Sequence, residues 1–251
     1  MNAGFELMMT GCTDTGRVRE HNEDAIAWDA PSGLAILADG MGGHSAGDVA
    51  SQMAVDGLMR LIAGKCAADG TISDCIPILR EAVRQTNADI LGHAHKDPRC
   101  AQMGTTVVLT LFRGRRMLTM HAGDSRVYRL RDTQFVALTQ DHSLVRQLVE
   151  QGAMTETEAR NSPYTSVITR ALGCHATVEP ELQEFAVAPG DVYALCSDGL
   201  YTLITEDDIR TILLEARGDW EVAARQLVQR ANEGGGRDNI SVIIVSVVDN
   251  S

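Results

Sequence analysis

The sequence predicts an α+β layered sandwich, in which two antiparallel sheets pack together and helices lie outside them. Strand-like segments gather at the start, the middle and the end of the chain, and helical patterns come in pairs between them. The regular alternation of one strand with one helix that builds a parallel sheet is absent. No linker, repeat or change of composition divides the 251 residues, so we expect a single domain over 1–251.

The first part of the chain reads as three strands followed by two helices. Apolar runs predict strands over 5–12, 25–29 and 34–39, the last two joined by a turn at Pro31-Ser32-Gly33. Apolar residues then recur near helical spacing, which predicts helices over 46–63 and 73–95.

The second part begins with four short strand-like segments that follow one another and therefore predict an antiparallel meander: 104–112, 117–123, 126–130 and 135–138. A short helix over 143–151 and a capping-box pattern at 155–158 come next. The remaining expected elements are strands over 181–187 and 192–196 around Pro189-Gly190, helices over 209–216 and 220–231 with Asp219 as a cap, and a closing strand over 240–248.

Composition excludes several classes of function. The 22 basic and 34 acidic residues give a net charge of −12, which argues against nucleic acid and anionic membranes, since both need a basic surface. The longest apolar stretch, 242–248, is far shorter than the roughly 20 residues of a membrane helix. The six cysteines form no C-x-x-C pair and no signal sequence precedes them, so we expect reduced thiols and a cytoplasmic protein.

Carboxylates follow two of the predicted buried strands directly. Asp39-Gly40 comes after 34–38, and Asp198-Gly199 comes after 192–197. An Asp-Gly pair alone is a common turn, but a surface turn does not require an apolar strand leading into it. Further Asp-containing motifs stand near the ends of other strands, at Asp24, Asp124 and Asp238. We expect these strand ends to meet at one cleft.

Several carboxylates in one cleft repel one another unless they are protonated or bind metal. An all-oxygen ligand set selects hard ions, magnesium or manganese, over zinc or copper. Two such ions can share a hydroxide and hold a phosphorus centre for in-line displacement, and Arg19 can bind phosphate oxygens in a bidentate manner. No G-x-S-x-G motif or C-x5-R loop is present, so a metal-bound water is the simplest nucleophile.

Eight motifs in order make the chain similar to the metal-dependent type 2C Ser/Thr protein phosphatases in their compact bacterial form, from about Gly11 to Val248. The motifs are Arg19-Glu20-His21-Asn22-Glu23-Asp24, Asp39-Gly40-Met41-Gly42-Gly43, Gly104-Thr105-Thr106, Gly123-Asp124-Ser125-Arg126, Asp141-His142-Ser143-Leu144-Val145, Ile168-Thr169-Arg170-Ala171-Leu172-Gly173, Ser197-Asp198-Gly199-Leu200 and Arg237-Asp238-Asn239. The resemblance implies a four-layer α-β-β-α sandwich.

The resemblance also implies a role for each matching residue. It makes Asp39 the bridging ligand of two Mn²⁺ or Mg²⁺ ions. Asp198 and Asp238 would bind the first ion, and the Gly40 carbonyl would bind the second, with Glu23 acting there through water. Asp124 and Asp198 would bind a weaker third ion. Arg19 would bind phosphate, and Asp24 and Asn239 would orient the ligands. The implied reaction is hydrolysis of phosphoserine and phosphothreonine by attack of the metal-bridging hydroxide.

Two features depart from the family pattern. Met41 stands where some members carry a histidine proposed as the general acid, which leaves a water on the third ion and His44 as alternatives. Residues 140–173 resemble the mobile flap beside the active site, but the centre of this segment lacks the usual basic residues. The implied partners are phosphorylated proteins and a cognate Ser/Thr kinase, and we expect a monomer.

Two other functions are weighed against this one. Gly40-Met41-Gly42-Gly43-His44-Ser45 approaches the dinucleotide-binding G-x-G-x-x-G, but the last glycine is missing and no strand ending in an acid follows at the required distance. The second alternative is a catalytically silent, phosphatase-like binding module, since a fold does not determine an activity. Every expected ligand and Arg19 are present, which favours the enzyme.

Overall fold

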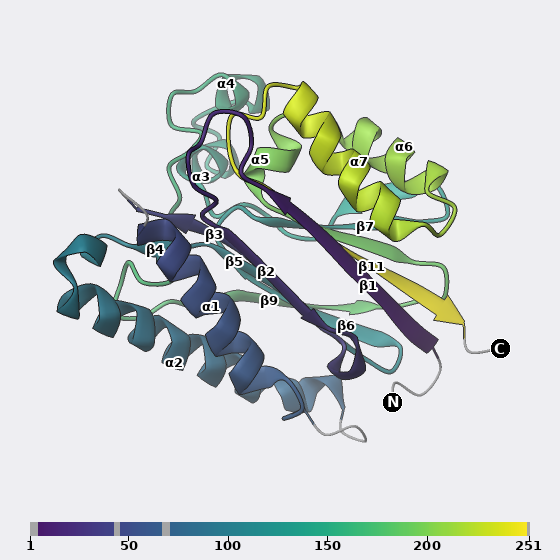
Figure 1. The fold of residues 1–251 in the computed structure, drawn as a ribbon, viewed down its shortest axis with the longest axis horizontal. Helices are drawn as coiled ribbons and strands as arrows, with labels where there is room; N and C mark the ends of the chain where they lie inside the picture. The colour runs from purple at the N-terminus through teal and green to yellow at the C-terminus, as the bar shows by residue number, and fades with distance from the viewer. Residues whose placement is uncertain (1–4, 43–45, 67–70, 250–251) are drawn as a thin grey trace.

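The computed structural model describes residues 5–42, 46–66 and 71–249. Two antiparallel sheets pack face to face, and helices cover the outer face of each (Figure 1). The predicted class, two antiparallel sheets flanked by helices, is confirmed. None of the helices in the described ranges combines the length and the apolar character needed to cross a bilayer.

One sheet has five strands, which are β1 (Phe5–Asp14), β7 (Arg126–Arg131), β8 (Gln134–Ala137), β10 (Val192–Cys196) and β11 (Ile240–Asp249). Their order is β1-β11-β10-β7-β8. Its outer face is covered by α5 (Asp198–Tyr201), α6 (Glu206–Glu215) and α7 (Trp220–Glu233). The Asp219 side chain accepts from the Val222 backbone N–H at 3.1 Å and so caps α7, as predicted.

The other sheet follows the order β2-β3-β5-β6-β9, with β4 paired to β3. Its strands are β2 (Asp24–Asp29), β3 (Leu34–Met41), β4 (Gly104–Thr105), β5 (Val107–Arg113), β6 (Arg116–Ala122) and β9 (Glu181–Ala186). The predicted helices over 46–63 and 73–95 correspond to α1 (Ala46–Ile62) and α2 (Cys75–Lys96), which cover this sheet. The described residues also form three 3-10 turns: η1 (Ala30–Ser32), η2 (Ile72–Asp74) and η3 (Pro98–Cys100).

Aliphatic and a few aromatic side chains fill three layers of core. One layer lies between α1, α2 and the six-stranded sheet, and a second lies between α5 to α7 and the five-stranded sheet. The third lies between the two sheets and includes Leu37, Phe112, Tyr193 and Ile243, all fully buried. Burial of apolar surface on both faces of both sheets stabilises the four-layer arrangement.

The predicted four-strand meander over 104–138 is wrong. β5 and β6 pair with each other in one sheet, whereas β7 and β8 pair in the other. The chain crosses between the sheets at residues 123–125. Gly123 permits the crossing, since its φ is +119° and a Cβ there would lie 2.5 Å from the Thr106 Cβ. The strands β9 and β10, expected around Pro189-Gly190, also belong to different sheets.

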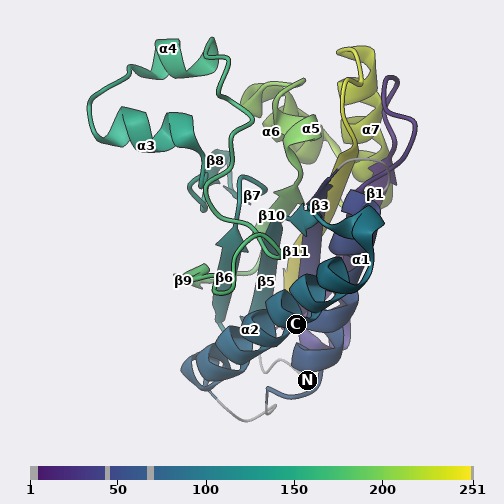
Figure 2. The ribbon, with the colours of Figure 1, turned by 90° about the vertical axis from the view of Figure 1, so that its left-hand side faces the viewer.

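Two short helices stand off one end of the sandwich, α3 (Leu144–Glu150) and α4 (Glu156–Arg160) (Figure 2). They form the centre of the segment 140–173. The predicted capping box at Thr155 is confirmed, with Glu158 as its reciprocal partner. None of the residues of α3, all of which the structure describes, is buried. The helix α3 therefore contributes little to the core.

Candidate metal and phosphate site

Asp39 lies near the end of β3, and its backbone is held from two sides. Its N–H donates to Thr106 Oγ1 at 3.2 Å, and its carbonyl accepts from the Thr106 N–H at 2.8 Å and from Thr105 Oγ1 at 2.9 Å. Across the β2–β3 ladder its partner is Asp24. The motif Gly104-Thr105-Thr106 therefore acts on the site by fixing the main chain of Asp39.

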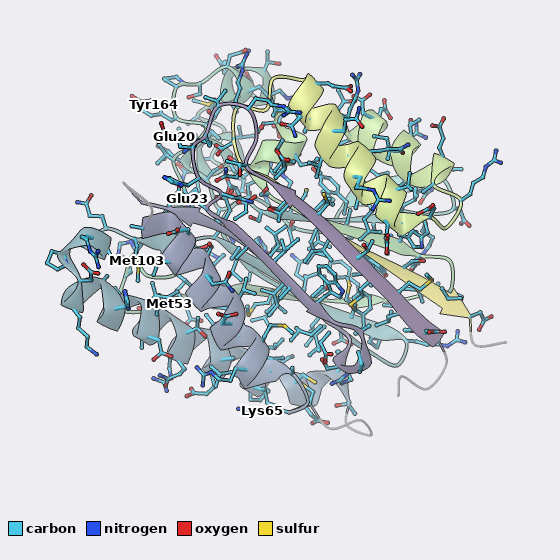
Figure 3. The ribbon with its side chains drawn as sticks, viewed as in Figure 1. Glu20, Glu23, Met53, Lys65, Met103 and Tyr164 are labelled. Carbon is cyan, nitrogen blue, oxygen red and sulfur yellow. The ribbon has the colours of Figure 1, made fainter. Side chains whose placement is uncertain are left out.

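Gly40 follows at the point where β3 touches the start of α1. A Cβ on Gly40 would lie 2.0 Å from the Gly47 carbonyl oxygen, so only glycine fits this close approach. The Gly40 N–H donates to the Glu23 carbonyl at 3.0 Å. Glu23 itself lies beside the beginning of α1, where its Oε1 is 2.7 Å from the position that a Gly47 Cβ would take (Figure 3).

The five-stranded sheet supplies Asp198 and Asp238. Asp198 begins α5 directly after β10, and Asp238 lies two residues before β11. A Cβ on Gly199 would lie 2.0 Å from the Asn239 carbonyl oxygen, so these two loops are in direct contact. The carboxyl groups of Asp198 and Asp39 lie close enough that each affects the pKa of the other. Arg19 Nη2 donates to Asp238 Oδ2 at 2.8 Å.

Asn239 is buried and binds the loop that carries Arg19. Its Oδ1 accepts from the Glu23 N–H at 2.8 Å, and its Nδ2 donates to the carbonyls of Thr15 and His21, each at 2.9 Å. One amide side chain thus fixes three points of residues 15–23 against the start of β11. This contact places Arg19 and Glu23 relative to the carboxylates.

Asp24 joins the two sheets below the cluster. Its Oδ2 accepts from Ser197 Oγ at 2.8 Å, and Ser197 Oγ in turn accepts from the Ser241 N–H at 3.0 Å. Asp24 is buried, and among the described residues nothing hydrogen-bonds to its Oδ1. An unpaired buried carboxylate oxygen is costly, so this atom fits a site that takes up further ligands.

Burial, with mutual repulsion added, raises the pKa values of these carboxyl groups. Burial raises the pKa of Asp198 to about 6, with repulsion from Asp238 added. Burial also raises the pKa of Asp24 to about 7 and that of Asp124 to about 7, and Asp198 repels both. Desolvation together with the charges of Asp24, Asp198 and other neighbours raises the pKa of Asp39 well above its usual range. Such a cluster favours a bound cation over solvent.

The carboxylates are gathered but do not form a closed ligand set. In the part of the chain that the structure describes, no three of them place one oxygen each within 4.8 Å of the other two. Asp238 is paired with Arg19 while its charge also acts on Asp39 and Asp198. All-oxygen donors with several negative charges fit Mn²⁺ or Mg²⁺ better than softer ions.

Asp124 lies on the crossing between the sheets and is buried. Tyr201 Oη donates to the Asp124 carbonyl at 3.0 Å. The guanidinium carbon of Arg126 lies 3.7 Å from the centre of the Tyr201 ring, and Arg126 binds Asp141 through two hydrogen bonds of 2.8 and 2.7 Å. The sequence assigns no role to Arg126, Asp141 or Tyr201, although the first two lie inside quoted motifs.

Of the two residues considered for proton transfer, the structure describes the position of Met41 but not that of His44. Met41 is the last residue of β3 and is half-buried. His44 lies outside the described residues. Two buried histidines, His121 and His142, lie near the Asp124 loop and are not expected from the sequence. They are stacked, a contact that no local pattern in the sequence shows.

Comparison with known proteins gives one consistent family. The family profile described as "Protein phosphatase 2C" matches residues 15–237. The chain is 41% identical over 239 residues to the serine/threonine protein phosphatase PstP of Mycobacterium tuberculosis (strain ATCC 25618 / H37Rv), covering 94% of this chain but only 44% of that relative's length. It is 36% identical to the serine/threonine phosphatase stp of Listeria monocytogenes serovar 1/2a, covering 93% of each.

The fold agrees with solved structures. The catalytic domain of the phosphatase PstP in complex with 2 manganese ions superposes with a TM-score of 0.86 and 38% identity, covering 98% of this chain and 100% of that one. Together with the profile match and the geometry at Asp39, this similarity shows that the chain belongs to the protein phosphatase 2C family.

Proposed function

We propose that this protein is a metal-dependent phosphatase that hydrolyses phosphoserine and phosphothreonine in proteins. The observation that carries the proposal is the cluster at Asp39, where carboxylates from both sheets meet beside Arg19. A related catalytic domain, PstP, is described in complex with 2 manganese ions. Residues 1–251 would act as one catalytic domain, with the flap at 140–173.

The residues present fit two core divalent ions, Mn²⁺ or Mg²⁺, and a weaker third. We assign Asp39 to both core ions, Asp198 and Asp238 to the first, and the Gly40 carbonyl with Glu23 to the second. Asp124 would take the third ion together with Asp198. When bound, the ions supply Lewis-acid activation of water and neutralise negative charge on the phosphoryl group.

The remaining site residues bind and orient. Arg19 is half-exposed at the edge of the cluster, and its planar guanidinium matches two phosphoryl oxygens. We assign Asp24 and Asn239 to orienting the ligands. Their hydrogen bonds to Ser197 and to residues 15–23 hold the ligands in place, a contribution that commonly matters nearly as much as the ligands themselves.

The partners follow from the reaction and the charge. Phosphorylated proteins are the substrates, and a cognate Ser/Thr kinase would supply them. The net charge of −12 disfavours nucleic acid and anionic membranes. We propose a monomeric, cytoplasmic enzyme.

The test is hydrolysis of p-nitrophenyl phosphate and of a phosphothreonine peptide by protein depleted with EDTA and resupplied with Mn²⁺. Activity should require the ion and should fall by about 100-fold or more in Asp198→Asn, because several kcal/mol of charge stabilisation are lost. Asp207→Asn, an exposed change on α6, is the matched control. Full activity in EDTA, or in Asp198→Asn, contradicts the proposal, and Mn²⁺ binding without hydrolysis would indicate the silent binding module.

A further inference from the structure

His142 binds both sides of the Gly123 residue that leads into Asp124. The Gly123 N–H donates to His142 Nδ1 at 3.3 Å, and the His142 N–H donates to the Gly123 carbonyl at 2.9 Å. His142 lies 19 positions further along the chain. The side chain and the main chain of one residue thus fix a single peptide segment of the crossing.

The crossing needs such a contact, because it belongs to neither sheet. Gly123 has a φ of +119°, outside strand geometry, and β7 begins only at Arg126. Beyond the bonds to His142, the described contacts of this stretch are few: Tyr201 Oη binds the Asp124 carbonyl, and Ser125 Oγ shares a hydrogen bond with Thr106 Oγ1. The position of the Asp124 carboxyl therefore depends on how firmly Gly123 is held.

The imidazole of His142 is itself fixed by three neighbours. The ring stacks on His121 with a centroid distance of 4.4 Å and an interplanar angle of 5°. Its Nε2 lies 3.3 Å from Glu181 Oε2 and 3.0 Å from Arg170 Nη1. His121 and Glu181 are cross-strand partners on β6 and β9, so the ring rests on the edge of the six-stranded sheet.

The protonation state suits an acceptor at Nδ1. Burial, together with His121 and the Arg170 cation, lowers the pKa of His142 to about 4, so the ring is neutral near pH 7. With Nδ1 accepting from Gly123, the ring hydrogen resides on Nε2 and is donated to the Glu181 carboxylate. Arg170 Nη1, 3.0 Å from Nε2, is also a donor, so in this tautomer it lies beside Nε2 without a hydrogen bond to it.

The same side chains do not form a convincing metal site. His121, His142 and Glu181 bring one ligand atom each within 4.8 Å of the others. Nearly parallel stacked rings, however, keep their nitrogen lone pairs in two parallel planes, so the lone pairs do not converge on one ion. The Arg170 guanidinium, 3.0 Å from His142 Nε2, would also repel a cation. A hydrogen-bonding role explains the cluster better.

The return end of the flap meets the same residue. The Thr169 N–H donates to the His142 carbonyl at 2.8 Å, and the Leu144 N–H donates to the Val167 carbonyl at 2.8 Å. Leu172 and Thr105 exchange two backbone hydrogen bonds, at 3.0 and 2.9 Å. Both ends of the segment 140–173 are therefore joined next to the Gly123–Asp124 peptide.

We propose that His142 is a positioning residue: its Nδ1 holds the Gly123 peptide, and thereby the Asp124 carboxylate, in register with Asp198, while its main-chain carbonyl binds the returning end of the flap at Thr169. The part of this proposal that concerns metal rests on the proposed role of Asp124 at the weaker ion site. The part that concerns the hydrogen bonds to Gly123 does not depend on that role.

Two variants separate the contacts of the ring. His142→Asn keeps an acceptor oxygen near the position of Nδ1, whereas His142→Gln carries its amide further out, near Nε2, and loses the acceptor for Gly123. His95→Asn, an exposed change on α2, is the matched control. Amide hydrogen exchange is measured on metal-free protein, and the Gly123 rate is divided by that of Leu195 in the centre of β10 to remove global opening.

We expect the normalised exchange of Gly123 to rise about fivefold in His142→Gln, as loss of one hydrogen bond implies, and to stay near wild type in His142→Asn. Mn²⁺ calorimetry should show the weaker site losing about 10-fold in affinity in His142→Gln only, with the core sites unchanged. Equal Gly123 exchange in both variants and wild type overturns the proposal, as does an equal loss of the weak site in both variants.

Asp124→Asn distinguishes this failure from failure of the proposed function. If that variant leaves the Mn²⁺ isotherm unchanged, Asp124 is not a metal ligand, and the Gly123 exchange rates alone then decide whether His142 positions the crossing. If Asp124→Asn removes the weak site, the Gly123 exchange rate and the Mn²⁺ affinity of the weak site both test the proposal. Each must then depart least from wild type in His142→Asn and most in His142→Gln.

Discussion

Arg19 and Asp238, 219 positions apart in the chain, form a hydrogen-bonded ion pair at 2.8 Å. In the proposed mechanism they serve different partners, since Arg19 binds phosphate and Asp238 binds metal. The two side chains are 49% and 35% exposed, and a pair this exposed contributes no more than about 1 kcal/mol. The pair is therefore weak enough to be replaced when the ion and the substrate arrive.

Replacing Arg19 should separate the two functions. Arg19→Ala should raise the KM for a phosphothreonine peptide by about 10-fold or more, because charge-assisted hydrogen bonds to phosphate are lost. The Mn²⁺ affinity of the core sites should stay the same or increase, since Asp238 loses a competing partner. Steady-state kinetics and calorimetry measure the two effects. Arg19→Lys should show an intermediate KM, and a variant that lost more metal affinity than substrate affinity would contradict the assignment.

Removing the Asp124 charge should stabilise the metal-free protein in a pH-dependent way. Burial raises the folded-state pKa of Asp124 to about 7, above the unfolded value near 4. Between these values the unfolded chain has released the proton and the folded chain has not, so this group destabilises the fold increasingly as pH rises. Asp124→Asn avoids that cost.

The Tm of Asp124→Asn should therefore match wild type near pH 4 and exceed it by about 5 °C near pH 8. Calorimetric scans of EDTA-treated protein at several pH values measure the difference. A saturating Mn²⁺ concentration should reverse the order, because only wild type gains the third ion. A Tm difference that does not change with pH would show that the Asp124 carboxyl is not desolvated as the structure indicates.

Glycine 40 should not tolerate a side chain. The Cβ of Gly40→Ala would lie 2.0 Å from the Gly47 carbonyl oxygen and 2.7 Å from that of Glu23, and both are main-chain atoms that cannot turn aside. We expect a loss of about 1–3 kcal/mol in the free energy of unfolding and at least about 10-fold in activity, as β3 and α1 move apart.

The matched change is Gly92→Ala on α2. Nothing lies within 4 Å of a Cβ at that position, and alanine in a helix interior gains about 0.5–1 kcal/mol over glycine. Urea denaturation should therefore show that Gly40→Ala lowers stability and Gly92→Ala raises it. Hydrolysis of p-nitrophenyl phosphate measures the activity of both variants. Unaltered activity in Gly40→Ala would show that activity does not require the close packing between Gly40 and the start of α1.

Asp191 should stabilise the fold without serving the reaction. It is fully buried at the start of β10 and accepts from Arg131 Nε at 2.6 Å, Arg131 Nη2 at 2.7 Å and Tyr193 Oη at 2.9 Å. Burial alone would raise the pKa of Asp191, but these hydrogen bonds outweigh it and hold the pKa below its ordinary value.

Asp191→Asn should lower the free energy of unfolding by about 3 kcal/mol at pH 7, because it breaks a buried ion pair. The difference from wild type should shrink as pH falls below about 4, because the Asp191 carboxyl of the unfolded chain is protonated there before that of the folded chain, whose pKa is lower. Urea midpoints at pH 7 and pH 3.5 measure this, and the kcat of the folded variant at 25 °C should stay unchanged. An equal loss at both pH values would assign the effect to packing.

The sequence was sufficient to predict the candidate site where the signal is local. Asp39 and Asp198 each follow a buried strand and precede a glycine that permits a close backbone approach, all within ten residues. The hydrogen bonds of Asn239 to residues 15–23 could not be predicted in this way, since their partners lie 216–224 positions away. Its expected orienting role came from family resemblance alone.

The predicted strand pairing was wrong where a short connection was interpreted as a hairpin. Only residues 123–125 separate β6 from β7, and consecutive strands with short connections usually pair. The pattern within each strand does not state which sheet it joins. That choice depends on tertiary contacts such as Gly123 against Thr106 and His142 against Gly123. The stacked histidines were missed for the same reason, because β6 and residue 142 meet only in the folded chain.

The order of the five-stranded sheet has a consequence for synthesis in the cell. β1 pairs along its whole length with β11, and β11 also separates β1 from β10. At 5–20 residues per second, the partner of β1 leaves the ribosome roughly 10–50 s after β1 itself. Until then Phe5 and Leu7, buried in the finished protein, remain exposed to other chains and chaperones. A nascent chain stopped before residue 240 would lack β11, the strand that joins β1 to β10, and should be cleared by proteolysis.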